Sequence, residues 1–212
     1  SFLLKGIFII HAHIVHYSGL LHLGREALGS KDIPVYVMPK MYSFLENNAP
    51  WSQLVNLKNI QLNPLQNNKY VEPLKNLKIT PILVPHRDEF SETVGYKIKG
   101  PNKTILFIPD IDKWTLWEEN LITILKEVDV AFIDATFFSQ EEVNYRPLSE
   151  IPHPLVLETI AYLKNEDISL KNKVYFIHMN HTNPMLDENS KVSKLIFNEG
   201  FKIARLGYQF EL

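Results

Sequence analysis

Short apolar runs along this chain repeatedly end in a histidine or an aspartate. Each run has the length of a β-strand, and the polar residues that follow are His11, His13, His86, Asp110, Asp134 and His178. Because strand ends meet along one edge of a sheet, residues far apart in the sequence can share a site there. The pattern therefore predicts a fold in which a sheet edge carries the chemistry.

The apolar runs alternate with stretches of helical periodicity, which is typical of an α/β fold. The strands are marked by β-branched and aromatic residues between turn signals, and the helices by caps such as Ser18. The expected strands cover residues 6–10, 35–37, 60–62, 77–84, 93–98, 104–108, 130–133, 173–177, 201–204 and 208–210. The expected helices cover residues 19–28, 41–47, 114–128, 154–165 and 190–199.

The composition fits a single globular domain over residues 1–212. Of these residues 45% are hydrophobic, which is enough for one continuous core. The formal net charge of −2 gives no electrostatic reason to expect nucleic-acid or membrane binding, and the lack of cysteine excludes thiolate chemistry. The longest apolar runs are far too short to span a membrane. We therefore expect a cytoplasmic protein with a small-molecule substrate, and homo-oligomerisation is left open.

The first histidine cluster gives the strongest signal of chemistry. His11, His13 and His16 directly follow the apolar run 6–10. If extended geometry persists to residue 13, His11 and His13 point to the same face, because side chains alternate along a strand. Two imidazoles on one face can bind one divalent ion, and His16 is placed for a second ion near the start of the next helix. The alternative is a loop of surface histidines.

These motifs resemble those of the metallo-β-lactamase superfamily, and within it those of the coenzyme PQQ synthesis protein B-like branch. The superfamily signature is His-x-His-x-Asp-His, followed by a later histidine, a bridging aspartate and a final histidine. The stretches that carry the closer likeness span residues 6–184 and read HAHIVHYSGLLHLGREALG, VPHRDE, FIPDIDKW, IDATFF and FIHMNHTNP. The resemblance implies an αββα sandwich. In this superfamily several strands normally precede the first motif, whereas here only residues 1–10 precede His11, so part of the N-terminal half-sheet is expected to be absent.

The resemblance also implies a set of ligands for a first metal ion. That ion would be held by His11, His13 and His86, with one position left for water, as in catalytic zinc sites. Asp110 would match the bridging carboxylate and would act in catalysis by orienting the attacking water. Imidazole suits zinc, although iron or manganese would also accept this donor set.

A second ion would be held by Asp110, His16 and a late histidine. For that histidine we favour His178, which directly follows a strand, over His181 in the next loop. Val15 stands where the signature has its metal-binding aspartate, and an isopropyl group cannot bind a cation. The sequence therefore leaves open whether one ion or two are bound.

The leading hypothesis for function is metal-dependent hydrolysis of an ester or phosphodiester-type substrate by a metal-activated water. A second hypothesis follows from the branch resemblance and is an iron-dependent oxidative step on a peptide-derived tyrosine. A third is a degenerate, non-catalytic binding protein, which the valine at position 15 would suit.

Other polar residues receive plainer interpretations. His153, between two prolines, is expected to be a surface or rim residue, and His22 is expected to be a packed or half-exposed helix residue. Asp112 is expected to cap a helix that begins near Trp114. Asp134 follows a strand and is a candidate for the border of the pocket.

Overall fold

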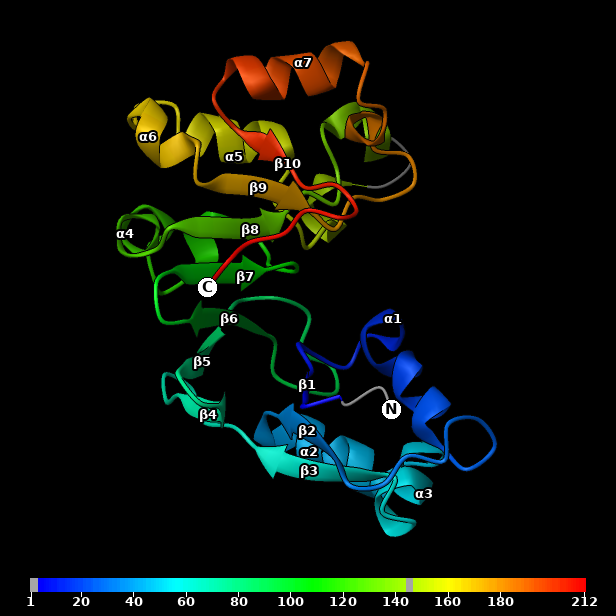
Figure 1. Cartoon of the computed structure of the whole chain (residues 1–212). Coiled ribbons are helices and arrows are strands. Elements are labelled where there is room, and N and C mark those ends of the chain that lie inside the picture. Colours follow the sequence, from blue (N-terminus) through cyan, green and yellow to red (C-terminus); the bar gives the residue numbers. More distant parts are fainter. Residues whose placement is uncertain (1–3, 144–146) are drawn as a thin grey trace. The chain divides into compact units, whose positions relative to one another are not determined.

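The computed structural model describes residues 4–143 and 147–212, which fall into two compact units. The first unit comprises Ser1–Leu83 and Asp88–Val94, and the second comprises Val84–Arg87 and Gly95–Leu212. Each unit has its own strands and helices (Figure 1). The expectation of a single domain over residues 1–212 stays a prediction.

The first unit is built on a parallel sheet in which β2 (Ile33–Val37) lies between β1 (Ile7–Phe8) and β3 (Ile60–Pro64). Val35 and Val37 of β2 are fully buried and share one hydrophobic core with residues of the neighbouring helices. These helices are α1 (Ile14–Tyr17), the 3₁₀ helix η1 (Ser18–Leu23), α2 (Pro39–Asn47) and α3 (Trp51–Asn56). The unit also contains an antiparallel pair formed by β4 (Val71–Leu74) and β5 (Leu77–Leu83).

The second unit is built on a sheet with the strand order β10-β9-β8-β7-β6. These strands are β6 (Val94–Lys99), β7 (Thr104–Ile108), β8 (Val130–Asp134), β9 (Val174–Ile177) and β10 (Lys202–Ile203). β6 is antiparallel to β7, and the other neighbours are parallel. Since β7, β8 and β9 run the same way, their C-terminal ends meet at one edge, as the sequence predicted.

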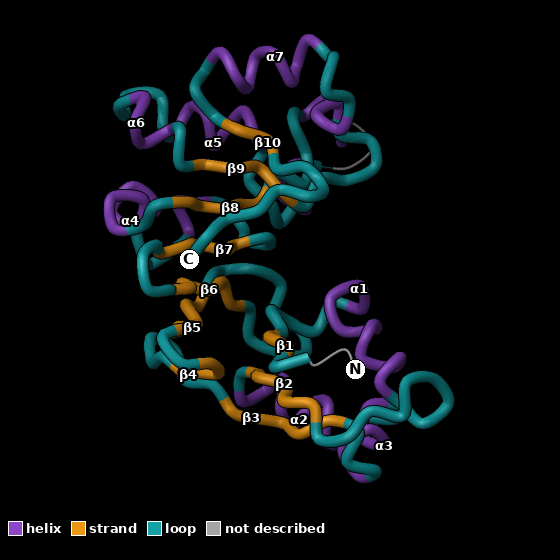
Figure 2. Tube along the Cα trace, viewed as in Figure 1, coloured by secondary structure: helices purple, strands orange, loops and turns teal. Residues whose placement is uncertain are grey.

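Helices accompany the strands of the second unit, as Figure 2 shows in purple and orange. The α-helices are α4 (Leu121–Glu127), α5 (Val156–Tyr162), α6 (Ile168–Lys171) and α7 (Lys191–Asn198). The 3₁₀ helices are η2 (Trp114–Leu116), η3 (Gln140–Val143), η4 (Leu148–Glu150) and η5 (Pro184–Leu186). Ser190 caps α7 by accepting a hydrogen bond from the Ser193 backbone N–H, which fits its expected start.

Two expected helices are wrong in extent or type. The segment 19–28 contains the 3₁₀ helix η1 instead of an α-helix, and η1 ends where Gly24 turns to an extended conformation with ψ 169°. The segment 114–128 is divided into η2 and α4. The division arises because the Asn120 side chain accepts a hydrogen bond from Thr123 N and starts a new helix there.

Residues 208–210 form a loop where a strand was expected. Tyr208 and Phe210 pack their rings against Tyr175 of β9, with centroid separations of 6.3 and 5.2 Å. The aromatic pattern therefore reflects packing on a sheet and not strand pairing. The short elements α3, β4 and α6 were not predicted.

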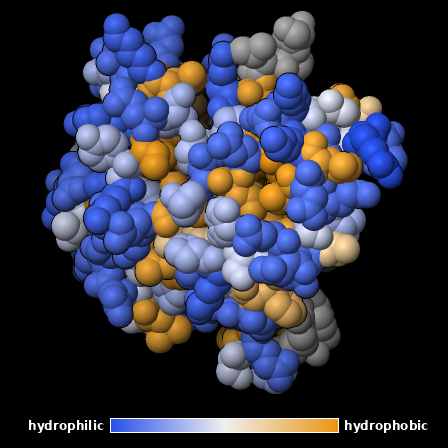
Figure 3. All heavy atoms as spheres, turned by 90° about the horizontal axis from the view of Figure 1, so that it is seen from below, coloured by the Kyte–Doolittle hydropathy of each residue, from blue (hydrophilic) through white to orange (hydrophobic). Residues whose placement is uncertain are grey.

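The described residues contain no helix with the length and hydrophobicity needed to cross a membrane. On the face drawn in Figure 3, hydrophobic side chains reach the surface between hydrophilic ones.

Candidate metal centre

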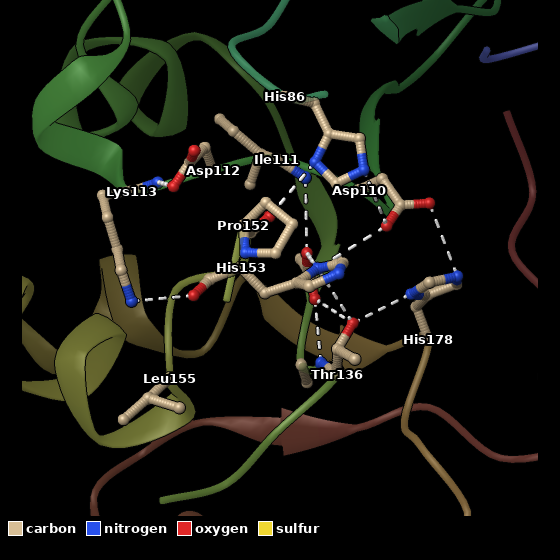
Figure 4. Close-up of polar contacts among 12 residues, drawn as sticks. His86, Asp110, Ile111, Asp112, Lys113, Thr136, Pro152, His153, Leu155 and His178 are labelled. Atoms are coloured by element: carbon tan, nitrogen blue, oxygen red, sulfur yellow. Dashed lines mark hydrogen bonds and ion pairs between the residues drawn. The ribbon is translucent and has the colours of Figure 1, made fainter. Parts of the chain in front are cut away.

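A buried carboxylate lies at the C-terminal edge of the second unit's sheet. Asp110 follows β7, and its side chain is only 2% exposed. Three imidazoles surround it, with His178 Nε2 3.5 Å from Oδ2, and with His153 Nδ1 3.6 Å and His86 Nε2 3.9 Å from Oδ1 (Figure 4). All three separations exceed the 2.7–3.2 Å of ordinary N–H···O bonds. His86, Asp110 and His153 offer ligand atoms within 4.8 Å of one another, so they could hold one cation.

The backbone joins the loops that carry these side chains. Asp112 N donates to Pro85 O at 2.7 Å, which ties the loop after β7 to the segment of His86. His86 Nδ1 lies 3.1 Å from the carbonyl oxygen of Pro152, the residue before His153. The loop after β7 and the segments of His86 and His153 are therefore fixed to one another.

Asp134, the last residue of β8, supports the centre from behind. Its Oδ1 accepts hydrogen bonds from Thr136 N at 2.8 Å and Thr136 Oγ1 at 2.7 Å. Its Oδ2 accepts from Ile111 N at 3.3 Å and lies 2.7 Å from His153 Nδ1. A carboxylate that is completely buried, as this one is, requires such compensation.

The protonation of His153 is set by opposing effects. Burial acts to lower the pKa of this imidazole, but the carboxylates of Asp134 and Asp110 outweigh burial, and the net result is a raised pKa. Arg87 acts against the two carboxylates. His153 is therefore placed to hold or release a proton beside Asp110.

His178 follows β9 in a left-handed backbone conformation, with φ 61°. Its Nδ1 lies 3.0 Å from Thr136 Oγ1. The turn after it is held by Asn180 N, which donates to Thr136 O at 3.0 Å, and by the buried Asn183, whose Nδ2 donates to Ala135 O at 2.7 Å. His181 is exposed in the same turn, which favours His178 as the residue that faces Asp110.

The first unit gathers three further imidazoles. The ring of His11 lies 4.2 Å from that of His13 and 4.6 Å from that of His16, measured between centroids. His13 Nε2 lies 3.3 Å from Glu89 Oε2. Such a group of imidazoles is a donor set that suits zinc.

The condition that strand geometry continues to residue 13 is met only in part, because β1 ends at Phe8 and the chain bends at Ala12, although His13 itself is extended with φ −90° and ψ 135°. Ala12 N donates to Ser91 Oγ at 2.8 Å and holds the bend. The histidines meet through this bend and the single turn of α1, not through strand alternation. Val15 lies on α1 and is 76% exposed.

The structure brings together His86, Asp110 and His178 in one unit, and His11, His13 and His16 in the other. The predicted sharing of ions across these two groups stays a prediction.

The structure corrects the plainer interpretations at three residues. Of the two positions expected for His153, surface or rim, the first is wrong, since its side chain is only 14% exposed and lies against Asp134 and Asp110. The two flanking prolines were the sequence feature that could have indicated an ordered position for His153, because prolines restrict the backbone. The carbonyl oxygen of Pro152 also lies within hydrogen-bond distance of His86 Nδ1. Asp112 does not cap a helix at Trp114, because the position before η2 is Lys113, which makes no side-chain cap. His22, expected to be packed or half-exposed, is instead exposed on η1.

Comparison with known proteins identifies the family. The model of the beta-lactamase superfamily domain matches residues 3–179, which is most of the chain. The chain is 23% identical to the coenzyme PQQ synthesis protein B of Nitrosococcus oceani, over 95% of this chain and 72% of that protein. It is 24% identical to the protein of the same name from Acinetobacter baumannii, over 99% of this chain and 74% of that protein.

A solved structure shows the same fold. The crystal structure of Zn²⁺-bound PqqB from Methylobacterium extorquens superimposes with a TM-score of 0.81 at 19% identity, covering 100% of this chain and 76% of that one. The predicted metallo-β-lactamase fold is therefore confirmed. The chain belongs to the β-lactamase superfamily, and over nearly its whole length it is similar to PqqB proteins.

Proposed function

We propose that this chain is a metal-dependent hydrolase that acts on an ester or phosphodiester bond of a small-molecule substrate. The observation that carries the proposal is the buried Asp110, surrounded by imidazoles at 3.5–3.9 Å. Imidazole nitrogens and a carboxylate oxygen gathered this closely could bind one cation.

The residues present fit a divalent ion, because imidazole nitrogens and a carboxylate oxygen are ligands that zinc, iron and manganese accept. In the second unit the ligands would come from His86, Asp110 and His178, and in the first from His11, His13 and His16. When bound, such an ion lowers the pKa of a water ligand to about 7 and polarises a substrate oxygen.

The chain itself supplies orientation and proton transfer. Asp110 would align an attacking water and receive its proton. In its protonated form His153, held at Nδ1 by Asp134, can hand the proton on its other ring nitrogen to a leaving oxygen and becomes neutral.

Hydrolysis of bis-p-nitrophenyl phosphate by protein loaded with zinc or manganese tests the proposal. Asp110→Asn should lower turnover by about 100-fold or more, the range of general acid–base effects. His22→Gln, which changes an exposed histidine outside both imidazole groups, should leave turnover unchanged. Turnover equal in wild type and Asp110→Asn, or none with either metal, would refute the hydrolase.

A second candidate function is favoured by the relatives, which are coenzyme PQQ synthesis proteins matched over nearly the whole chain. The corresponding activity is an iron-dependent oxidative step on a tyrosine in a peptide. Protein purified without chelator should then contain iron, and the iron form should consume oxygen only when a tyrosine-containing peptide is added. Tightly bound zinc with no iron would contradict this candidate.

A further inference from the structure

One hydroxyl lies among three groups of the second unit's centre. Thr136 Oγ1 is 2.7 Å from Asp134 Oδ1, 3.0 Å from His178 Nδ1 and 3.2 Å from His153 Nδ1 (Figure 4). A threonine hydroxyl has one proton to donate and two lone pairs to accept with. The direction of its hydrogen bonds therefore decides what its neighbours must do.

The hydroxyl proton goes to Asp134. Each oxygen of that carboxylate accepts a backbone N–H, Thr136 N on Oδ1 and Ile111 N on Oδ2, so the group acts as an acceptor. The 2.7 Å contact with Thr136 Oγ1 is the shortest of the three and has the length of an O–H···O bond. With its proton committed there, the hydroxyl can only accept from the imidazoles.

His178 must then carry its proton on Nδ1. In a neutral imidazole with a proton on Nδ1, the other nitrogen, Nε2, is a lone pair. That atom lies 3.5 Å from Asp110 Oδ2, so a lone pair and a carboxylate oxygen face each other. A cation bound by both atoms would suit this arrangement.

The tautomer of His86 is fixed in the same way, but by a backbone carbonyl oxygen. Its Nδ1 lies 3.1 Å from Pro152 O, which can only accept, so Nδ1 carries the proton and Nε2 presents a lone pair 3.9 Å from Asp110 Oδ1. In His153 the Nδ1 proton goes to Asp134. All three rings are therefore oriented through Nδ1 by the protein, and for His86 and His178 this is how ligand histidines are usually held.

We propose that Thr136 is a positioning residue that fixes the tautomer of His178 and so directs its Nε2 lone pair toward Asp110. The hydroxyl is held rigidly, because Thr136 O also accepts from Asn180 N and its backbone N–H is bound by Asp134. The inference rests on the proposed function in one respect, namely that the Nε2 lone pair of His178 serves to bind a metal ion. The tautomer itself can be measured without metal.

The first experiment is ¹⁵N NMR of the histidine side chains in metal-free wild-type protein, at a pH where the His178 ring is neutral. The variant His178→Gln assigns the signal. The expected result is an Nδ1-protonated ring, and Thr136→Val should shift the ring toward the other tautomer, while Thr136→Ser should keep the wild-type pattern. An Nε2-protonated ring in the wild type would overturn the proposal, whether or not the protein binds metal.

The second experiment measures zinc affinity by competition with a chromogenic chelator. Loss of a hydrogen bond to a ligand histidine should weaken binding by about 10-fold to 100-fold in Thr136→Val, and Thr136→Ser should restore most of it. Thr159→Val is the matched control, because it removes another buried hydroxyl of the same unit, one that accepts from Trp114 Nε1 and does not contact the imidazoles. Equal affinity in wild type and Thr136→Val would overturn the role, and equal losses in both valine variants would show general destabilisation instead. Absence of zinc binding in the wild type would refute the proposed function but would leave the tautomer result to decide this inference.

Discussion

Asp134 fixes the segments around Asp110 through its hydrogen bonds, although Asp134 itself is not a candidate ligand. It accepts two hydrogen bonds on each oxygen, and the donors come from Ile111, Thr136 and His153. Each donor belongs to a segment that carries or adjoins a candidate ligand. A single buried carboxylate therefore sets the positions of the loop after β7, of His153 and, through Thr136, of His178.

Asp134→Asn should destabilise the protein by about 2 kcal/mol, because a hydrogen bond between a buried charge and its partners is lost and a donor replaces an acceptor. Urea unfolding followed by circular dichroism would measure this. Asp167→Asn, at an exposed position before α6, is the control and should change stability by less than about 0.5 kcal/mol. An Asp134→Asn variant as stable as the wild type would contradict the supporting role.

Val15→Asp should restore a ligand that the superfamily signature has and this chain lacks. The position is exposed in the first turn of α1, where a negative charge is compatible with the helix dipole, so folding should not suffer. The expected result is one more zinc ion per chain by elemental analysis, with higher phosphodiesterase turnover. Ile14→Asp adds the same charge one residue earlier and should do neither; a gain in both variants, or in neither, would show that position 15 is not a ligand position.

At the scale of elements, the sequence predicted the strands whose pattern recurs along the chain, and it missed a helix boundary that depends on a single side chain. The strands β7, β8 and β9 were recognisable because each is an apolar run ended by a polar residue, and parallel pairing brings those ends together. The break between η2 and α4 depends on one asparagine cap inside an otherwise helical pattern. His153 was misjudged because its burial depends on contacts with Asp110 and Asp134, which lie 43 and 19 residues away in the sequence.

The turn after β9 is the element on which His178 depends. Asn183 is buried, donates to Ala135 O and accepts from Met185 N, so Asn183→Ala should cost about 2 kcal/mol by leaving buried backbone groups without their partners. Zinc affinity should fall with stability, because His178 would lose its fixed position. Chelator competition and urea unfolding together would measure both effects. Asn189→Ala, at an exposed position in the same connection, should alter neither, and unchanged affinity in Asn183→Ala would separate the turn from the centre.

At the scale of the whole molecule, both compact units carry a group of imidazoles. Within residues 4–143 and 147–212, the second unit alone also has a buried carboxylate, Asp110, among its imidazoles. The superfamily fold and the likeness to PqqB over nearly the whole chain were both accessible from the motifs. The assignment of individual ligands to individual ions was not, because it depends on contacts between segments that no sequence pattern encodes.

Removal of metal should lower thermal stability. A ligand that binds only the folded state at 1,000 times its Kd adds about 4 kcal/mol to the free energy of unfolding, which for a chain of this length is roughly 10 °C in Tm. Dialysis against a chelator should lower Tm by that order, and zinc should restore it. The control is calorimetry of Asp110→Asn with and without zinc. If zinc raises the Tm of this variant as much as that of the wild type, Asp110 is not a ligand of the ion.

The left-handed backbone at His178 limits how this centre could change over evolution. Few side chains tolerate that conformation without strain, and asparagine, aspartate, histidine and glycine are the main ones. Of the replacements, only aspartate would still bind a cation strongly, and carboxylates favour harder ions such as manganese or magnesium. A lineage that altered its metal preference at this position would therefore have one practical route, a single histidine-to-aspartate exchange.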